Sequence, residues 1–140
     1  MPARSATSNR TARAVDEKIT INLGHVDLGQ VDLLVQEGFY ANRSDLIRTA
    51  IRNQLALHGE AVRQVVSRKA LVLGIHHYTV ADLRAVEAAG QTLQIRVLGL
   101  ASIASDVTPA LALATIESLT VLGALHASPA VKAALAQRIS

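Results

Sequence analysis

The chain has 140 residues, of which half are apolar and 18% are charged, with a formal net charge of +3. This length allows one ordinary domain or two small ones, and the composition excludes a disordered acidic or basic chain. Because the chain has no cysteine, disulfides, thiolate metal sites and thiol catalysis are excluded. No uncharged apolar run reaches the about 18 residues that a membrane helix needs, and the N-terminus lacks the apolar stretch of a secretory signal. We therefore expect a cytoplasmic protein with no membrane partner.

Charge divides the chain into two halves of different character. Residues 1–69 contain 10 basic and 7 acidic residues, whereas residues 70–140 contain 4 of each. The second half is also richer in Ala, Leu, Val and Ile, so two modules with different roles are the simplest interpretation. We expect a flexible basic arm, a first domain, a linker or helix extension, and a second domain, at residues 1–16, 17–57, 58–70 and 71–140.

Residues 18–23, with the sequence KITINL, alternate strictly between polar and apolar side chains. This alternation predicts a short strand with Ile19, Ile21 and Leu23 on one face. A lone six-residue strand cannot pair its own backbone donors and acceptors. Antiparallel pairing with the same strand of a second chain, across a twofold axis, solves this problem. The paired ribbon then presents its polar face, with a cation and two hydrogen-bonding side chains per strand, in a form that suits the DNA major groove.

Two helices are predicted after this strand. Apolar residues recur at near-helical spacing over residues 26–37, and Gly38 is placed to end that helix. After the turn at residues 39–41, Asn42 or Ser44 offers an N-cap for a second helix of about twelve to fifteen residues. The first domain therefore reads as strand, helix, turn, helix.

This order of elements resembles the ribbon-helix-helix family of DNA-binding regulators, the CopG, Arc and MetJ type. The resemblance covers residues 17–57 and rests on three features: the polar and apolar strand, the Gly-containing turn, and the sequence NRSDLIR that opens the second helix. It implies an intertwined dimer that binds double-stranded DNA. It also implies that the outward strand residues read bases, here Lys18, Thr20 and Asn22, and that the start of the second helix holds a phosphate, here through Asn42, Arg43 and Ser44.

The N-terminal arm adds three cations to this half of the chain. A mobile basic arm beside a DNA-binding module often contributes phosphate or minor-groove contacts. We therefore expect further phosphate contacts from Arg4, Arg10 and Arg13.

The second half contains an internal repeat. The tripeptide VLG occurs at residues 72–74, 97–99 and 121–123, with spacings of 25 and 24 residues. Each copy precedes a Ser or Thr that can cap a helix, namely Thr79, Thr108 and Ser128. We expect VLG to end a short buried strand, and three βα-like repeats to form a parallel or mixed three-stranded sheet with helices on one side. The middle copy has four extra residues before its cap, which we assign to a longer strand. The fold class is therefore α+β, with a ribbon-helix-helix module followed by a small α/β domain.

Chemistry-bearing motifs are scarce in this half. The acidic residues are scattered, and no phosphate-binding glycine loop is present. Adjacent histidines on a strand point to opposite faces, so at most one of His76 and His77 can share a site with His126. We expect no catalytic residues, no cofactor and no metal site, and therefore no enzyme.

The sequence favours a sequence-specific bacterial transcriptional regulator, expected to be a repressor, located in the cytoplasm at the nucleoid. Its neutral, apolar second half is expected to associate with copies of itself, giving a homodimer or a higher homo-oligomer. Two alternatives remain open: a DNA-organising or partition protein that multimerises on DNA, and the antitoxin of a toxin-antitoxin pair.

Overall fold

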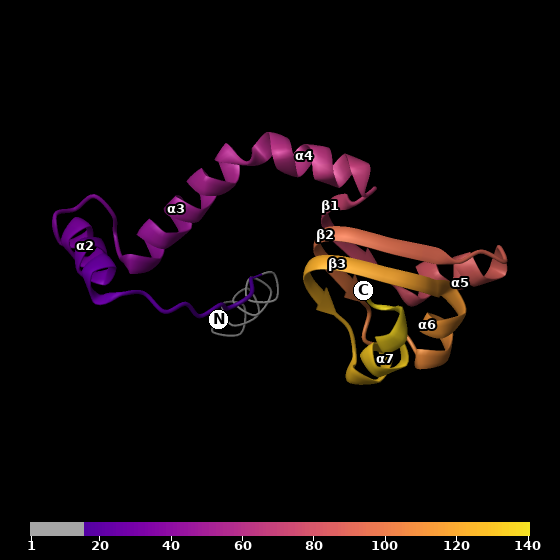
Figure 1. The fold of residues 1–140 in the computed structure, drawn as a ribbon. Helices are drawn as coiled ribbons and strands as arrows, with labels where there is room; N and C mark the ends of the chain where they lie inside the picture. Colours follow the sequence, from indigo (N-terminus) through magenta and orange to yellow (C-terminus); the bar gives the residue numbers. More distant parts are fainter. Residues whose placement is uncertain (1–15) are drawn as a thin grey trace, which may run out of the picture. The chain divides into compact units, whose positions relative to one another are not determined.

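The structure, a computed structural model, describes residues 16–140 (Figure 1). Within them the chain forms two compact units, residues 16–65 and residues 66–140. The expected basic arm with Arg4, Arg10 and Arg13 lies outside the described residues.

The first unit is built on two helices joined by a tight turn. Helix α2, His25–Gln36, ends at Glu37, and Gly38 follows in the left-handed region at φ 84°. That conformation suits glycine because it carries no Cβ. Helix α3, Arg43–Leu57, has 15 residues, and its N-cap is Asn42. Both predicted helices are thus confirmed, and the choice between the two candidate caps is settled in favour of Asn42.

A third helix, α4, spans Gly59–Arg68 and carries the chain from the first unit into the second. The backbone N–H of His58 bonds the carbonyls of Gln54 and Leu55, which closes α3 before α4 begins. The helical pattern after residue 57 therefore forms a separate helix.

Residues 16–23 form neither helix nor strand in the described chain. The strand expected at residues 18–23 needs a partner strand, and none of the described residues supplies one. The ribbon thus remains a prediction about the assembled dimer.

The second unit is a three-stranded parallel sheet with helices on one side (Figure 1). The strands lie in the order β1-β2-β3, and each is followed by a helix. The mixed α+β class is therefore confirmed for the described residues. The elements are β1 Val72–Tyr78, α5 Val80–Ala88, β2 Leu93–Ile103, α6 Pro109–Thr115, β3 Ile116–His126, α7 Pro129–Ala134 and the 3₁₀ turn η1 Ala136–Arg138.

The core of this unit lies between the sheet and its helices. Alternate residues of β2, including Ile95 and Val97, are buried together with Leu83 of α5, Ala112 of α6 and Val131 of α7. Each helix begins at a capping hydroxyl that accepts a backbone N–H, at Thr79, Thr108 and Ser128. The predicted caps thus fix where each helix starts over the sheet.

The VLG tripeptides occupy equivalent positions on the three strands. Val72 pairs with Val97 and Val97 with Val121, and the same register aligns the leucines and the glycines. The expectation that VLG ends each strand is wrong, because every strand continues to Tyr78, Ile103 or His126. The expected burial of the tripeptides is wrong as well, because among their nine residues only Val97 is buried, whereas Leu73 and Leu122 are exposed.

The extra residues of the middle copy also differ from the prediction. They do not lengthen β2, which ends four residues after its glycine, as β1 does. Instead, residues 104–107 form a turn closed by the N–H of Val107 and the carbonyl of Ala104.

The third residue of each VLG copy is a glycine for a structural reason. Gly74, Gly99 and Gly123 all have positive φ, at 131°, 139° and 119°. A Cβ on Gly99 would overlap the carbonyl oxygen of Gly74, and a Cβ on Gly123 would overlap that of Gly99. The neighbouring backbones approach each other here as closely as glycine allows.

We expect Gly99→Ala to lower the free energy of unfolding by more than about 3 kcal/mol, because backbone strain of about 1–3 kcal/mol adds to the steric overlap. Gly74→Ala is the matched control, because Gly74 has a similar φ but a Cβ there meets nothing within 4 Å. In the unassociated chain the control should cost only the strain, about 1–3 kcal/mol. Denaturant unfolding of both variants measures the difference, and equal losses would contradict the steric explanation.

Candidate nucleic-acid interface

The segment at residues 18–23 is exposed along its whole length. Lys18, Thr20 and Asn22 are all exposed. The alternating apolar residues are exposed as well, with Ile19 at 73% and Ile21 at 56% of their full accessibility. Both the polar and the apolar side chains of this segment are therefore in contact with solvent.

The apolar residues of this segment face a groove on their own chain. The groove, about 500 Å³ in volume, lies between residues 17–21 and the first half of α3. Ile19 and Ile21 line one side, and Ile47 and Ile51 of α3 line the other. Lys18, Ser44 and Arg48 also contribute to its walls. The groove is thus an apolar channel with polar and basic side chains in its walls.

No residue between 16 and 70 is buried. A folded domain normally hides most of its large apolar side chains from water. Here the large apolar residues of the strand segment, α2, the turn and α3 stay exposed, namely Ile19, Ile21, Leu23, Val26, Leu33, Leu34, Phe39, Ile51, Leu55 and Leu57. The first unit therefore has no hydrophobic core of its own.

The start of α3 is held by a reciprocal pair of hydrogen bonds. The N–H of Asp45 donates to Oδ1 of Asn42 at 2.8 Å, and the N–H of Ala41 donates to Oδ2 of Asp45 at 2.9 Å. The first N–H groups of a helix have no acceptor within the helix, and they favour anions. Asn42 satisfies the N–H of Asp45, whereas Arg43 and Ser44 stand at the first two positions of α3, where the helix itself offers no acceptor for an N–H group.

Arg43 is engaged in a contact that the sequence did not reveal. Its Nε donates to Oδ1 of Asp32 at 2.7 Å, and its Nη2 donates to Oδ2 at 2.8 Å. This forked pair links α2 to α3. Hydrogen bonding to Arg43 lowers the pKa of Asp32 below its ordinary value, and the same hydrogen bonds raise the pKa of Arg43. Nη1 takes no part in the pair and keeps its donors.

The predicted site residues are therefore partly brought together. Asn42, Arg43 and Ser44 form one cluster at the start of α3, and Ser44 also reaches the groove beside Lys18. Two residues were missing from the predicted set, Asp32 and Arg48. Arg48 carried a signal, since it is a cation one turn after Ser44, but nothing in the sequence joins Asp32 to a residue eleven positions later.

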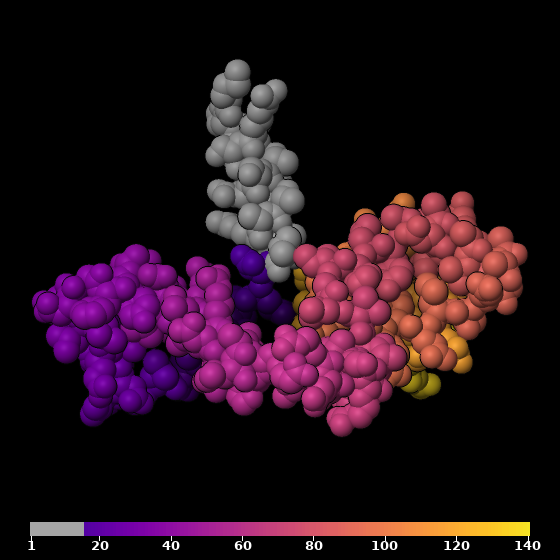
Figure 2. Space-filling model, turned by 90° about the horizontal axis from the view of Figure 1, so that it is seen from above, coloured from indigo at the N-terminus to yellow at the C-terminus, as the bar shows by residue number. Residues whose placement is uncertain are grey.

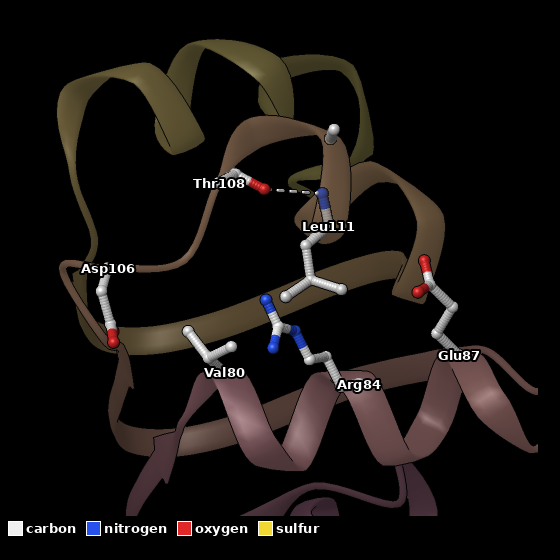
Figure 3. Close-up of a pocket in the computed structure, with 7 residues that line it drawn as sticks. Val80, Arg84, Glu87, Asp106, Thr108 and Leu111 are labelled. Carbon is white, nitrogen blue, oxygen red and sulfur yellow. Dashed lines mark hydrogen bonds between the residues drawn. The ribbon is translucent and has the colours of Figure 1, made fainter.

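A shallow pocket in the second unit lies between α5 and α6 (Figure 3). Its volume is about 250 Å³, and its lining includes Arg84, Glu87 and Asp106. Figure 3 shows Arg84 rising from α5 toward α6, with Leu111 beside it. Neither ion pair found among the described residues involves Arg84. The pocket carries both signs of charge at its rim and indicates no particular class of ligand.

The histidines of the second unit lie on two faces of the sheet. His77 shares a cross-strand row with Ser102 and His126, and its Nδ1 lies 3.1 Å from the Ser102 hydroxyl. Among residues 16–140, no group of three His, Cys, Asp or Glu side chains is arranged to hold a metal ion. Over the same range, no helix has the length and apolar character needed to cross a membrane.

Comparison with known proteins adds one finding to this geometry. Residues 14–132 match the model of the ribbon-helix-helix transcriptional regulator family. The chain belongs to this family. Searches of curated proteins and of solved structures found no match.

The family match confirms the resemblance found at residues 17–57 and extends it. Because the match runs to residue 132, most of the sheet unit lies within the matched range. This ribbon-helix-helix protein is thus a DNA-binding transcriptional regulator by family.

We expect the Asp32 carboxylate to titrate below its ordinary value of 3.8. A carboxyl group whose pKa is lower in the folded than in the unfolded state stabilises the fold above the unfolded pKa. That contribution is lost as the pH falls through the folded value. NMR titration of the side-chain carboxyl carbon measures the midpoint, and Arg43→Gln should return it toward 3.8. A midpoint unaffected by Arg43→Gln would show that the pair does not persist in solution.

Proposed function

We propose that this protein is a sequence-specific DNA-binding regulator, a repressor, that acts as a dimer in the cytoplasm at the nucleoid. Two copies of residues 18–23 pair as an antiparallel ribbon, and the ribbon enters the DNA major groove. Lys18, Thr20 and Asn22 of each copy then read base edges, which present distinct donors and acceptors in that groove.

The single observation that supports the dimer most strongly is the missing core of residues 16–70. Ribbon pairing places the Ile19, Ile21 and Leu23 faces of both copies over their helices, where the groove beside Ile47 and Ile51 is open. Burying a large aliphatic side chain contributes about 1.5–3 kcal/mol. Several such residues in each chain supply a shared core that one copy lacks.

The start of α3 supplies the proposed phosphate contact. The N–H groups of Arg43 and Ser44, at the positive end of the helix dipole, fit an anionic oxygen. The hydroxyl of Ser44 adds a further donor. Arg43 contributes through Nη1 while its other donors hold Asp32. The same side chain thus fixes the angle between two helices and contacts DNA, and it remains a cation in both roles.

Arg4, Arg10 and Arg13 complete the proposal as backbone contacts of the N-terminal arm. Because such contacts neutralise phosphates and release counterions, they raise the affinity for all sequences alike. Their removal should reduce the salt dependence of binding, whereas the base-reading residues set the preference among sequences.

The second unit is proposed to associate with further copies. This supports the alternative of a DNA-organising protein, since both edge strands of its sheet have stretches that no described strand covers. The antitoxin alternative fits less well, because the tails of antitoxins fold on their toxin, whereas residues 71–140 already bury their own core.

The base-reading residues are tested by Thr20→Ala and Asn22→Ala. Each lost base contact should reduce the discrimination between the operator and random DNA by about 1–3 kcal/mol. The operator is first selected from a random library with the intact protein, and the affinities for both DNAs are then measured at one salt concentration. Ser67→Ala serves as the control, because Ser67 lies near the end of α4 and belongs to the other compact unit. Unchanged discrimination in both strand variants would refute this assignment.

The shared core is tested by Ile21→Asp. A buried unpaired carboxylate is costly, so ribbon pairing should fail and the first unit should lose its helical structure together with DNA binding. Thr20→Asp is the matched control, because it places the same charge on the outer face of the same segment. The control should keep the dimer and lose only DNA affinity. Sedimentation velocity distinguishes the two results, and a dimeric, folded Ile21→Asp variant would contradict the proposal.

A further inference from the structure

We infer that the sheet of one copy continues into the sheet of the next, with the outer edge of β1 paired in parallel with the uncovered part of β3 in a second copy. This inference rests on the proposed self-association and specifies its two edges, its direction and its register.

The outer edge of β1 is open along its whole length. Val72–Tyr78 pair with β2 on one side, and no described strand lies on the other. Leu73 is 68% exposed, and Val72 and Ile75 are exposed as well. The segment around β1, pink in Figure 2, lies at the surface in that view. An open, uncharged edge strand presents unpaired N–H and C=O groups and is a template for another strand.

The outer edge of β3 is only partly covered. Ile139 forms a parallel bridge with Leu119, and the N–H of Ser140 donates to the Leu119 carbonyl at 2.9 Å. Arg138 anchors this C-terminal segment through the carbonyls of Leu113 and Ile116. The C-terminus thus covers the first part of β3, and no described strand covers the part from residue 121 to residue 126.

The two open edges match in length and in register. Within the chain, Val72 is aligned with Val97 and Val121, and His77 is aligned with Ser102 and His126. If β1 of a second copy followed β3 with this same register, residues 72–77 would lie beside residues 121–126. This is the uncovered part of β3, so the joint uses all of the free edge and does not meet the C-terminal segment.

The glycines supply an independent argument for the same joint. Gly99 and Gly123 each accommodate the carbonyl of the glycine on the preceding strand. Gly74 has the same kind of backbone, with φ 131°, but a Cβ there would meet nothing within 4 Å in its own chain. Among residues 16–140, no strand precedes β1 to occupy that space. In the proposed joint, the carbonyl of Gly123 from the neighbouring copy takes that place.

The joint also extends an apolar row on the open face of the sheet. Leu73, Leu98 and Leu122 are directly aligned across the three strands, and Leu122 is 52% exposed. Leu73 of one copy would cover Leu122 of its neighbour. Because the joint uses two different edges, it is heterologous and can build chains or rings of copies beyond a dimer.

The experiment uses the full chain, which has no native cysteine, with the double substitution Leu73→Cys and Leu122→Cys. Directly opposed residues of neighbouring strands lie within disulfide range, whereas Leu73 and Leu122 of one chain are two strand spacings, about 9–10 Å, apart. Mild oxidation should therefore give a ladder of covalent species larger than a dimer. Each single variant should give no covalent product.

Two outcomes of this experiment would overturn the inference. A covalent dimer from Leu73→Cys alone would show that two β1 edges meet about a twofold axis. The absence of a ladder from the double variant, with the protein folded by circular dichroism, would show that the edges do not meet at all.

A pair of charge variants gives a second, independent readout. Leu73→Lys with Leu122→Lys places like charges across the joint, so sedimentation should show no species larger than the ribbon dimer. Leu73→Lys with Leu122→Glu places opposite charges there and should restore the larger species. Association lost equally in both variants would contradict the head-to-tail joint, since a twofold joint of β1 edges would bring the two introduced lysines together in each variant.

Failure of this inference is separable from failure of the proposed function. The ratio of the affinities for operator and random DNA should be the same in the charge variants as in the unmodified chain, because the joint lies outside residues 16–65. If the ladder forms while Thr20→Ala and Asn22→Ala leave DNA discrimination unchanged, the joint stands and the base-reading proposal falls.

Discussion

The first unit of this regulator depends on one constraint: it has helices, caps and an interhelical ion pair, but no buried residue from 16 to 70. Apolar burial is the main favourable term in folding, and in the proposed dimer the first unit obtains it from a second copy. The exposed Ile19 and Ile21 beside the groove under α3 indicate where that burial occurs. In the proposed dimer, folding and formation of the DNA-binding surface are therefore one event, and the recognition face exists only when two copies meet.

The second unit follows the opposite plan. It buries its own core between sheet and helices, with Leu83, Ile116, Leu119 and Leu135 fully shielded. Its hydrophobic core is complete, but backbone N–H and C=O groups at the outer edges of its sheet have no partner strand among the described residues. The proposed assembly thus combines an obligate twofold interface at the ribbon with a weaker, heterologous joint at the sheet. Linking dimers in this way raises the effective concentration of ribbons near neighbouring sites on DNA.

The ion pair between Arg43 and Asp32 links helix α2 to the start of helix α3. Both side chains are about half exposed, so the pair holds geometry more than it adds stability. Its forked hydrogen bonds orient the start of α3, where Asn42 and Asp45 already fix the first turn. In the proposed complex with DNA, this fixed first turn presents the N–H groups of Arg43 and Ser44 to a phosphate.

The sequence by itself determined the local features of this protein. Periodicity, the glycine at 38 and the capping residues Asn42, Thr79, Thr108 and Ser128 act over a few neighbouring positions, and the helices begin or end where they indicate. The tertiary structure alone decided the rest. The pairing of Arg43 with Asp32 depends on how two helices cross, and the place of VLG within the strands depends on the backbone of the neighbouring strand. Such contacts join residues far apart in the chain, so a pattern among neighbouring residues cannot predict them.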